Sequence, residues 1–157
     1  MEIVNIRIDD RLIHGQVAAV WSLVTQASRI MVIDDDVIKD VVNKEALKMA
    51  CPQRCKLSIL SAVKAATNLI EKKYEGERVF IVVKSPKTLC DVYDAGFHFD
   101  LVNVGNMGGK TDTTMVKKAV SVSEKDITNF KYLASKGIKI TAQMVPGDDP
   151  VDLMGLI

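Results

Sequence analysis

Four chemically reactive side chains lie close together near the amino terminus, in the segment "RIDDRLIHGQV" (residues 7–17). Asp9 and Asp10 follow a run of β-type residues, and Arg11 and His14 come directly afterwards. A neutral imidazole can act as a general base, a metal ligand or a nucleophile. The guanidinium of Arg11 can form two hydrogen bonds with a phosphate or carboxylate group. The segment therefore has the chemistry of an anion site, and His14 could accept a phosphoryl group.

The residues after His14 strengthen this interpretation, because a helical pattern begins there. Gly15 lets the backbone come close to a ligand, and the first amides of the helix, at Gly15 and Gln16, favour an anion. A phosphorylated His14 would carry roughly two negative charges, by analogy with other phosphorylated side chains. Arg11 and the helix amides would offset them, each charged hydrogen bond contributing on the order of 1.5–3 kcal/mol. Asp10 could orient the loop or the imidazole.

A structural interpretation of the same segment competes with the functional one. Asp9 and Asp10 could simply accept hydrogen bonds from turn amides, while His14 caps a helix. The chain would then be a non-catalytic interaction module. Spacing alone does not decide between the two interpretations.

Hydrophobic periodicity predicts an α/β fold with a parallel sheet. The predicted strands are Ile3–Ile8, Arg29–Ile33, Lys56–Leu60, Val79–Val83, Leu101–Val104, Val120–Val122 and Ile138–Met144. The predicted helices are Gln16–Gln26, Val37–Ala50, Ser61–Tyr74, Lys87–Ala95 and Glu124–Ser135. Strands such as "RVFIVV" are almost continuously apolar, which is typical of strands covered by helices on both faces. We predict one domain, residues 1–157, because no linker or low-complexity segment divides the chain.

Ligands of such sheets bind at the carboxyl ends of the strands, so the loops that follow the strands are expected to contain the binding residues. Ser85, after a predicted strand, could donate a hydrogen bond to a phosphoryl group or could cap the next helix. Gly105, in the loop "VGNMGGKT", could offer its amide to phosphoryl oxygens and form a flexible wall beside His14. Both are expected phosphate-binding residues, together with Gly15 and Gln16.

The loop "VGNMGGKT" (residues 104–111) also nearly matches a P-loop, with Gly109, Lys110 and Thr111 at its end. The match fails at the first position, where Val104 stands and the glycine comes one residue too late. Strand-like residues follow instead of a helix. A nucleotide-binding domain is the alternative, which loss of ATP binding on Lys110→Ala would test.

Other polar residues have simpler explanations. Asp34 and Asp35 are expected to cap the next helix, and His98 is expected to lie in a turn or on the surface. Cys51 and Cys55 are separated by a proline and have no histidine nearby, so a zinc site is not expected. Three cysteines, an odd number, indicate free thiols in a cytosolic protein.

Composition excludes several classes of protein. The net charge of +1, from 21 basic and 20 acidic residues, does not favour binding to a nucleic-acid backbone. No apolar run reaches the length of about 18 residues that a membrane-spanning helix needs. Strand residues begin at once, which leaves no room for a signal peptide.

The segment "RIDDRLIHGQV", with Trp21 shortly after it, closely resembles the signature of a bacterial family of enzyme IIB components. These are the IIB components of the mannose/fructose/sorbose family of the phosphoenolpyruvate-dependent sugar phosphotransferase system. The loop "NVGNMGG" and the late segment "ITAQMVP" resemble two further segments of that family. Asn106 departs from the pattern, since many members have glycine there, which bears on the shape of the loop.

The resemblance implies a fold, a reaction and partners. The fold would be a doubly wound, mainly parallel open sheet of about seven strands, with helices on both faces and the last strand antiparallel. His14 would accept a phosphoryl group, through Nδ1, from a phosphohistidine of the IIA protein. It would pass the group to a sugar held by the membrane components IIC and IID, as a protein-Nπ-phosphohistidine–sugar phosphotransferase. Arg11 and Asp10 would assist.

The resemblance also sets expectations about cofactors, location and specificity. Neither metal nor cofactor is expected, because the phosphoryl donor is already activated. The protein would be cytoplasmic and attached to the inner face of the membrane through IIC and IID. The sequence does not identify the sugar: mannose, fructose, sorbose and N-acetylgalactosamine stay open, as does the oligomeric state.

Overall fold

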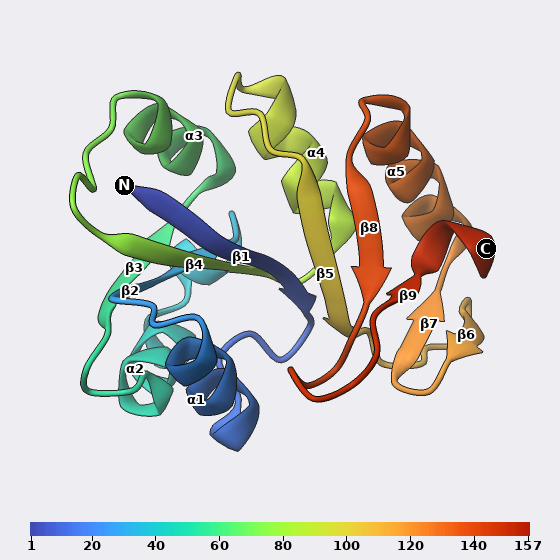
Figure 1. Ribbon diagram of the computed structural model, residues 1–157, viewed down its shortest axis with the longest axis horizontal. Coiled ribbons are helices and arrows are strands. Elements are labelled where there is room, and N and C mark those ends of the chain that lie inside the picture. The colour runs from blue at the N-terminus through green and yellow to red at the C-terminus, as the bar shows by residue number, and fades with distance from the viewer.

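The computed structural model describes all residues, 1–157, and contains one large sheet with helices on both faces (Figure 1). The seven strands of this sheet lie in the order β3-β2-β4-β1-β5-β8-β9, and only the last pair is antiparallel. A separate antiparallel hairpin is formed by β6 and β7. The strands are β1 (Glu2–Asp9), β2 (Arg29–Ile33), β3 (Lys56–Leu60), β4 (Arg78–Val83), β5 (Leu101–Asn106), β6 (Thr114–Lys117), β7 (Val120–Val122), β8 (Lys139–Ala142) and β9 (Val151–Asp152).

The helices are divided between the two faces of the sheet. They are α1 (Gly15–Val24), α2 (Val41–Ala50), α3 (Ala62–Ile70), α4 (Pro86–Asp94) and α5 (Glu124–Ser135), with short 3₁₀ turns at Val37–Lys39 and Leu153–Gly155. In Figure 1, α1 and α2 lie on one side of the sheet, and α3, α4 and α5 lie on the other. Right-handed crossovers explain this division, because the direction in which the chain moves along the sheet then decides the face on which each helix lies. The chain moves towards β3 after β1 and β2, and it moves in the opposite direction after β3. The doubly wound, mainly parallel fold is confirmed.

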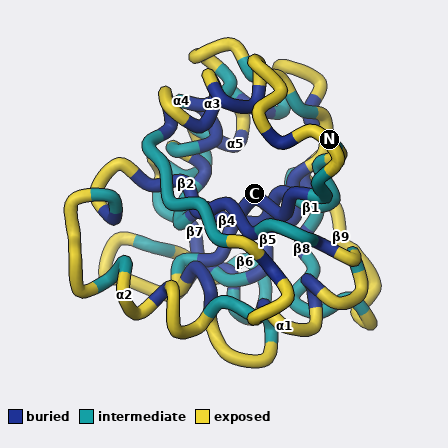
Figure 2. Tube along the Cα trace, turned by 90° about the vertical axis from the view of Figure 1, so that its left-hand side faces the viewer, coloured by how far each residue is buried: buried dark blue, intermediate teal, exposed yellow.

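Two hydrophobic cores result, one on each face. The larger contains 26 buried residues and lies under α3, α4 and α5; the smaller contains 12 and lies under α1 and α2. Central strands contribute to both, since alternate residues point to opposite faces: Ile81 belongs to the first core and Val82 to the second. Figure 2 shows that buried residues gather along the strands and that exposed residues gather in the outer loops.

Local sequence signals set several helix ends. Ser123 and Asp126 form a capping box at the start of α5, each side chain accepting a hydrogen bond from the other's backbone. Pro86 occupies the first turn of α4, where its missing N–H costs nothing. After α5, Gly137 adopts φ +83°, a left-handed conformation that glycine reaches without steric cost.

The structure corrects several predicted elements. Residues 120–122 form a strand as predicted, but this strand is β7 of the hairpin and not part of the large sheet. The predicted last strand, around residues 138–144, shortens to β8 and is parallel to β5. The antiparallel last strand is instead β9, which comprises only two residues and has no periodicity to reveal it. The predicted helix over residues 37–50 is split at Asp40, which caps α2 by accepting a hydrogen bond from Asn43 N.

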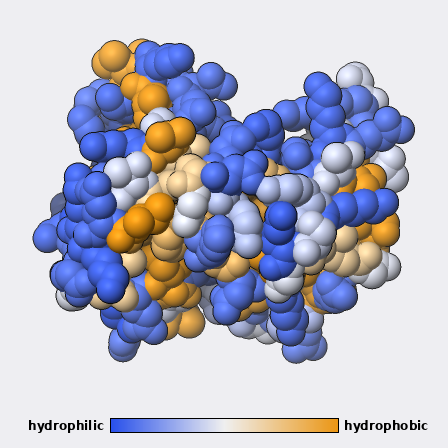
Figure 3. All heavy atoms as spheres, turned by 90° about the horizontal axis from the view of Figure 1, so that it is seen from above, coloured by the Kyte–Doolittle hydropathy of each residue, from blue (hydrophilic) through white to orange (hydrophobic).

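Figure 3 shows one outer face of the molecule, where hydrophilic residues dominate and apolar side chains form separate groups. None of the helices is both long enough and apolar enough to cross a lipid bilayer.

Candidate functional site

The candidate site lies at the carboxyl edge of the sheet, where β1 stands between β4 and β5. The chain leaves β1 towards α1 on one face, and it leaves the neighbouring strand β4 towards α4 on the other (Figure 1). The loops after these two strands therefore separate, as they do at the switch point of other doubly wound sheets. The end of β1 and the loop that follows it contain the four reactive residues.

His14 is exposed at this edge, immediately before α1. The preceding Leu12 and Ile13 are buried at 4% and 5% exposure, so they anchor the loop in the smaller core while the imidazole faces solvent. His14 has extended backbone angles (φ −135°, ψ 111°) and its side chain makes no capping hydrogen bond. The alternative in which the His14 side chain caps the helix is therefore wrong. Gly15 and Gln16 are exposed beside it, and Gly15 adopts φ +49°.

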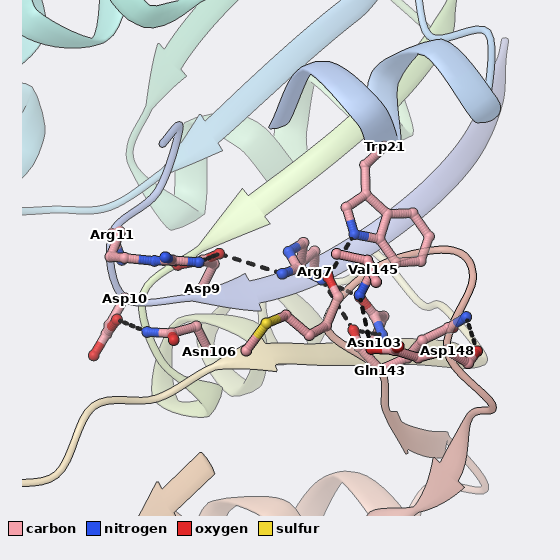
Figure 4. Close-up of polar contacts among 11 residues, drawn as sticks. Arg7, Asp9, Asp10, Arg11, Trp21, Asn103, Asn106, Gln143, Val145 and Asp148 are labelled. Carbon is pink, nitrogen blue, oxygen red and sulfur yellow. Dashed lines mark hydrogen bonds and ion pairs between the residues drawn. The ribbon is translucent and has the colours of Figure 1, made fainter. Parts of the chain in front are cut away.

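Asp9 holds Arg11 in a fixed orientation (Figure 4). Arg11 Nε donates to Asp9 Oδ1 and Arg11 Nη2 donates to Asp9 Oδ2, both at 3.0 Å. The backbone N–H of Arg11 also donates to Asp9 Oδ1 at 3.0 Å. These hydrogen bonds raise the pKa of Arg11, which stays protonated. Asp9 does accept a turn amide, as the structural interpretation predicts, but it also positions the guanidinium.

A second arginine, Arg7, lies on the other side of Asp9 and is only 2% exposed. Its Nη2 is 3.4 Å from Asp9 Oδ2, and its Nη1 donates to Asn103 Oδ1 at 2.8 Å and to Gln143 O at 3.1 Å. The guanidinium carbon lies 5.4 Å from the centre of the Trp21 ring. Burial lowers the pKa of Arg7, and the neighbouring Asp9 opposes that shift.

Sequence analysis did not single out Arg7 or assign Asp9 this role. A signal was available: Asn5, Arg7 and Asp9 alternate along β1, so three polar side chains point to one face of a central strand. Asn103 and Gln143 extend this polar face across β5 to the end of β8, and Asn103 Nδ2 also donates to Gln143 O at 3.0 Å.

Gly105 lies inside β5, is buried, and has its Cα directly against Arg7. A Cβ at this position would stand 1.9 Å from the guanidinium carbon of Arg7. The absence of a side chain at Gly105 therefore makes room for Arg7. Gly105 is therefore enclosed and does not form the flexible wall expected beside His14. The predicted hydrogen bond from the Gly105 amide to phosphoryl oxygens stays a prediction, which the burial of Gly105 does not favour.

Gly105→Ala is expected to lower the free energy of unfolding by about 1–3 kcal/mol, because the buried guanidinium must move to accommodate the methyl group. Denaturation in urea, monitored by circular dichroism, measures this change. Gly147→Ala is the matched control, since a Cβ at Gly147 would have no neighbour within 4 Å. Equal stabilities of the two variants would contradict the assignment.

Asp10 orients the neighbouring loop by contacts with β5 and the residues after it. Its carboxylate accepts hydrogen bonds from Asn106 Nδ2 and from Gly108 N, each at 2.7 Å. These contacts tie the loop after β1 to the residues at the end of β5, and the predicted assistance of Asp10 to His14 stays a prediction. Asn106, the departure from the family pattern, supplies one of these two hydrogen bonds and so fixes the loop.

The loop after residue 106 leads into the β6–β7 hairpin and not into a helix, which removes the element that a P-loop needs beneath its phosphates.

Ser85 precedes α4 without making a side-chain capping hydrogen bond. It lines a polar hollow of about 130 Å³ together with Asp10, Lys84 and Lys110. The hydroxyl of Ser85 is thus free for a ligand, and its contact with a phosphoryl group stays a prediction.

The remaining nucleophilic side chains are less suited to accept a phosphoryl group. Burial raises the pKa of the thiols of Cys51 and Cys55, and it raises the pKa of Cys90 to about 11, so all three favour the unreactive thiol form. His98 is exposed, as predicted, but it precedes β5 and therefore lies towards the opposite edge of the sheet, stacked on Tyr93 at 4.1 Å.

Asp34 has the capping role that its position predicts. Its Oδ1 accepts hydrogen bonds from the backbone N–H groups of Asp36 and Val37, at 2.9 and 3.0 Å. Asp35 instead accepts a hydrogen bond from Ala62 N at the start of α3. The prediction that Asp35 caps the next helix is therefore wrong, because its partner begins α3, 27 residues later in the chain.

The fold and the site together define a small doubly wound α/β domain whose switch-point loop contains an exposed histidine and an arginine held by Asp9. The chain belongs to the sorbose-subfamily IIB components of the phosphotransferase system, whose family model matches residues 3–157.

Relatives and solved structures agree with this assignment. The sorbose-specific EIIB component of Lacticaseibacillus casei is 36% identical over 96% of this chain and 92% of its own length. The mannose-specific EIIAB component of Escherichia coli K12 is 39% identical over 96% of this chain, which spans 47% of that longer protein. The crystal structure of the IIBSor domain of the sorbose permease from Klebsiella pneumoniae superposes with a TM-score of 0.94 at 35% identity, covering 99% of this chain and 95% of that one.

Proposed function

We propose that this protein is a phosphocarrier that receives a phosphoryl group on His14 from a phosphorylated IIA protein. It then transfers the group to a hydroxyl of a sugar held by the membrane components IIC and IID. The observation that carries the proposal is the exposure of His14 at the switch point, three residues after an arginine that Asp9 holds in place. Two different proteins must reach His14 in turn, and a loop anchored by buried residues but open to solvent permits both encounters.

The chemistry needs only the residues of this loop and the donor. The lone pair of one ring nitrogen of His14, in our proposal Nδ1, attacks phosphorus, and the donor histidine leaves with the electrons of the broken N–P bond. In the second step the sugar oxygen attacks phosphorus, and the ring nitrogen of His14 leaves with the electrons of the N–P bond. The released imidazole takes up the hydroxyl proton and is again neutral. Because the donor is already a reactive phosphoramidate, the protein contributes mainly position and charge. Arg11 and the exposed amides at Gly15 and Gln16 would receive the phosphoryl oxygens.

The relatives support the choice of partners. A mannose-specific EIIAB component joins IIA and IIB in one chain, which indicates that the two act in sequence. We infer that the protein works on the cytoplasmic side of the membrane, docked to IIC and IID, where the sugar emerges.

Peptide mapping tests the proposal directly. After incubation with phosphorylated IIA, tryptic digestion under alkaline conditions preserves the N–P bond and separates the two histidines. His14 lies on the fragment 12–29 and His98 lies on the fragment 88–110. We expect one added phosphoryl mass on fragment 12–29 and none on fragment 88–110. A phosphoryl group on any other fragment, or on none, would overturn the proposal.

A further inference from the structure

Arg7 presents an energetic problem that stability does not explain. It is among the largest fully buried side chains of the protein, and its counterion Asp9 is 1% exposed. Removing such charges from water costs several kcal/mol for each ion, and a buried ion pair often stabilises a fold no more than apolar residues would. Furthermore, β5 needs a glycine at position 105 to make room for the guanidinium. Because burying Arg7 is costly and also requires a glycine on the neighbouring strand, we expect Arg7 to have a role in function.

The charges of the loop suggest that role. Without Arg7, the loop after β1 would contain two carboxylates, Asp9 and Asp10, against the single guanidinium of Arg11. Its net charge would be −1, which opposes the approach of a phosphoryl dianion. Arg7 removes this excess. With it, the same groups sum to zero, and the ion-paired cluster of Arg7, Asp9 and Arg11 carries +1. The Asp10 carboxylate keeps its charge and accepts hydrogen bonds from Asn106 and Gly108.

The geometry of the cluster transmits this charge to the surface. Asp9 Oδ2 accepts from both guanidinium groups, with buried Arg7 on one side of it and partly exposed Arg11 on the other (Figure 4). Since Asp9 is shared between two cations, it orients Arg11 without neutralising it. One third of the Arg11 side chain is exposed, and its Nη1 is left without a partner among the hydrogen bonds of the protein.

We propose that Arg7 is a positioning residue for phosphoryl transfer, whose buried charge offsets Asp9 so that Arg11 presents a net positive charge to the phosphoryl group on His14. The proposal rests on the phosphocarrier function described above and adds a residue that does not itself touch the phosphoryl group. Asn103, the carbonyl of Gln143 and the ring of Trp21 hold Arg7 in place for this purpose.

The test compares initial rates of transfer from phosphorylated IIA to a series of variants. Arg7→Met removes the buried charge and is expected to lower the rate about tenfold or more, because the uncompensated Asp9 carboxylate then opposes the phosphoryl dianion. Arg7→Lys keeps the charge and is expected to stay within a few-fold of the wild type. The double variant Arg7→Met with Asp9→Asn restores the original net charge and should recover most of the lost rate. Because this variant is also expected to regain stability, rates are compared only between variants that circular dichroism shows to be folded.

Arg29 supplies a matched control. It also pairs with a carboxylate, Glu77, at 2.8 Å and lies over an aromatic ring, Tyr74, at 4.8 Å. However, Arg29 begins β2 and so lies at the opposite edge of the sheet from His14. Arg29→Met is therefore expected to leave the transfer rate unchanged, with circular dichroism confirming that each variant is folded.

The possible outcomes are distinct. If the wild type takes no phosphoryl group on His14, the phosphocarrier function fails and this proposal fails with it. If the wild type is labelled but folded Arg7→Met is labelled equally fast, only the role of Arg7 is overturned. A slow Arg7→Met that neither Arg7→Lys nor the double variant improves also overturns it. Should Arg7→Met not fold, Arg7→Lys and the double variant decide alone, and wild-type-like rates in both are required.

Discussion

His14→Ala is expected to abolish phosphoryl transfer from phosphorylated IIA while leaving the protein as stable as the wild type. The imidazole is the only nucleophile of the loop, and it is exposed without a capping hydrogen bond, so its removal leaves no cavity and no unsatisfied partner. The free energy of unfolding should change by no more than about 0.5 kcal/mol. Mass spectrometry under alkaline conditions measures the transfer, and urea denaturation measures the stability.

His98→Ala is the control for this experiment, because it removes the other histidine of the chain. It should accept phosphate at the wild-type level, although loss of the stack on Tyr93 could lower stability slightly. The assignment of His14 would be rejected if His14→Ala were labelled like the wild type, or if His98→Ala alone lost the label.

Asp9→Asn is expected to lower the free energy of unfolding by about 3–5 kcal/mol, the cost of removing one partner of a buried ion pair. Its carboxylate faces two guanidinium groups, and Arg7 has no access to water once the counterion is gone. Asparagine occupies nearly the same volume as aspartate, so the decrease in the free energy of unfolding measures the effect of the lost charge and not of altered packing. Urea denaturation at neutral pH provides the measurement.

Asp10→Asn is the comparison for this prediction. Asp10 is less buried, and its two partners are neutral amide groups of Asn106 and Gly108, so we expect a loss of only about 1 kcal/mol. Combining Asp9→Asn with Arg7→Met removes both buried charges and should recover much of the stability. Similar decreases in the free energy of unfolding for Asp9→Asn and Asp10→Asn would contradict the large stabilising contribution that we assign to the Asp9 carboxylate.

Much of the fold could be predicted because its signals are local. The strand β2 is predicted with its observed ends, since a continuous apolar run is typical of a buried parallel strand. The edge strand β3 is also predicted with its observed ends, although Ser58 interrupts its apolar residues. The capping box at Ser123 and the stop at Gly137 depend on side chains within a few residues of each other. By contrast, β9 was missed because two exposed residues become a strand only by pairing with β8.

The candidate site divides in the same way. The sequence by itself determined which chemistry is present, because an imidazole, a guanidinium and helix-start amides lie within a few residues at the end of one strand. Only the tertiary structure decided how that chemistry is supported. Arg7 and Gly105 are 98 residues apart in the chain and meet because β1 and β5 pair side by side, and Gln143 joins them from the end of β8. Such contacts depend on strand order and register, which are set by packing over the whole sheet and leave no trace in short-range spacing.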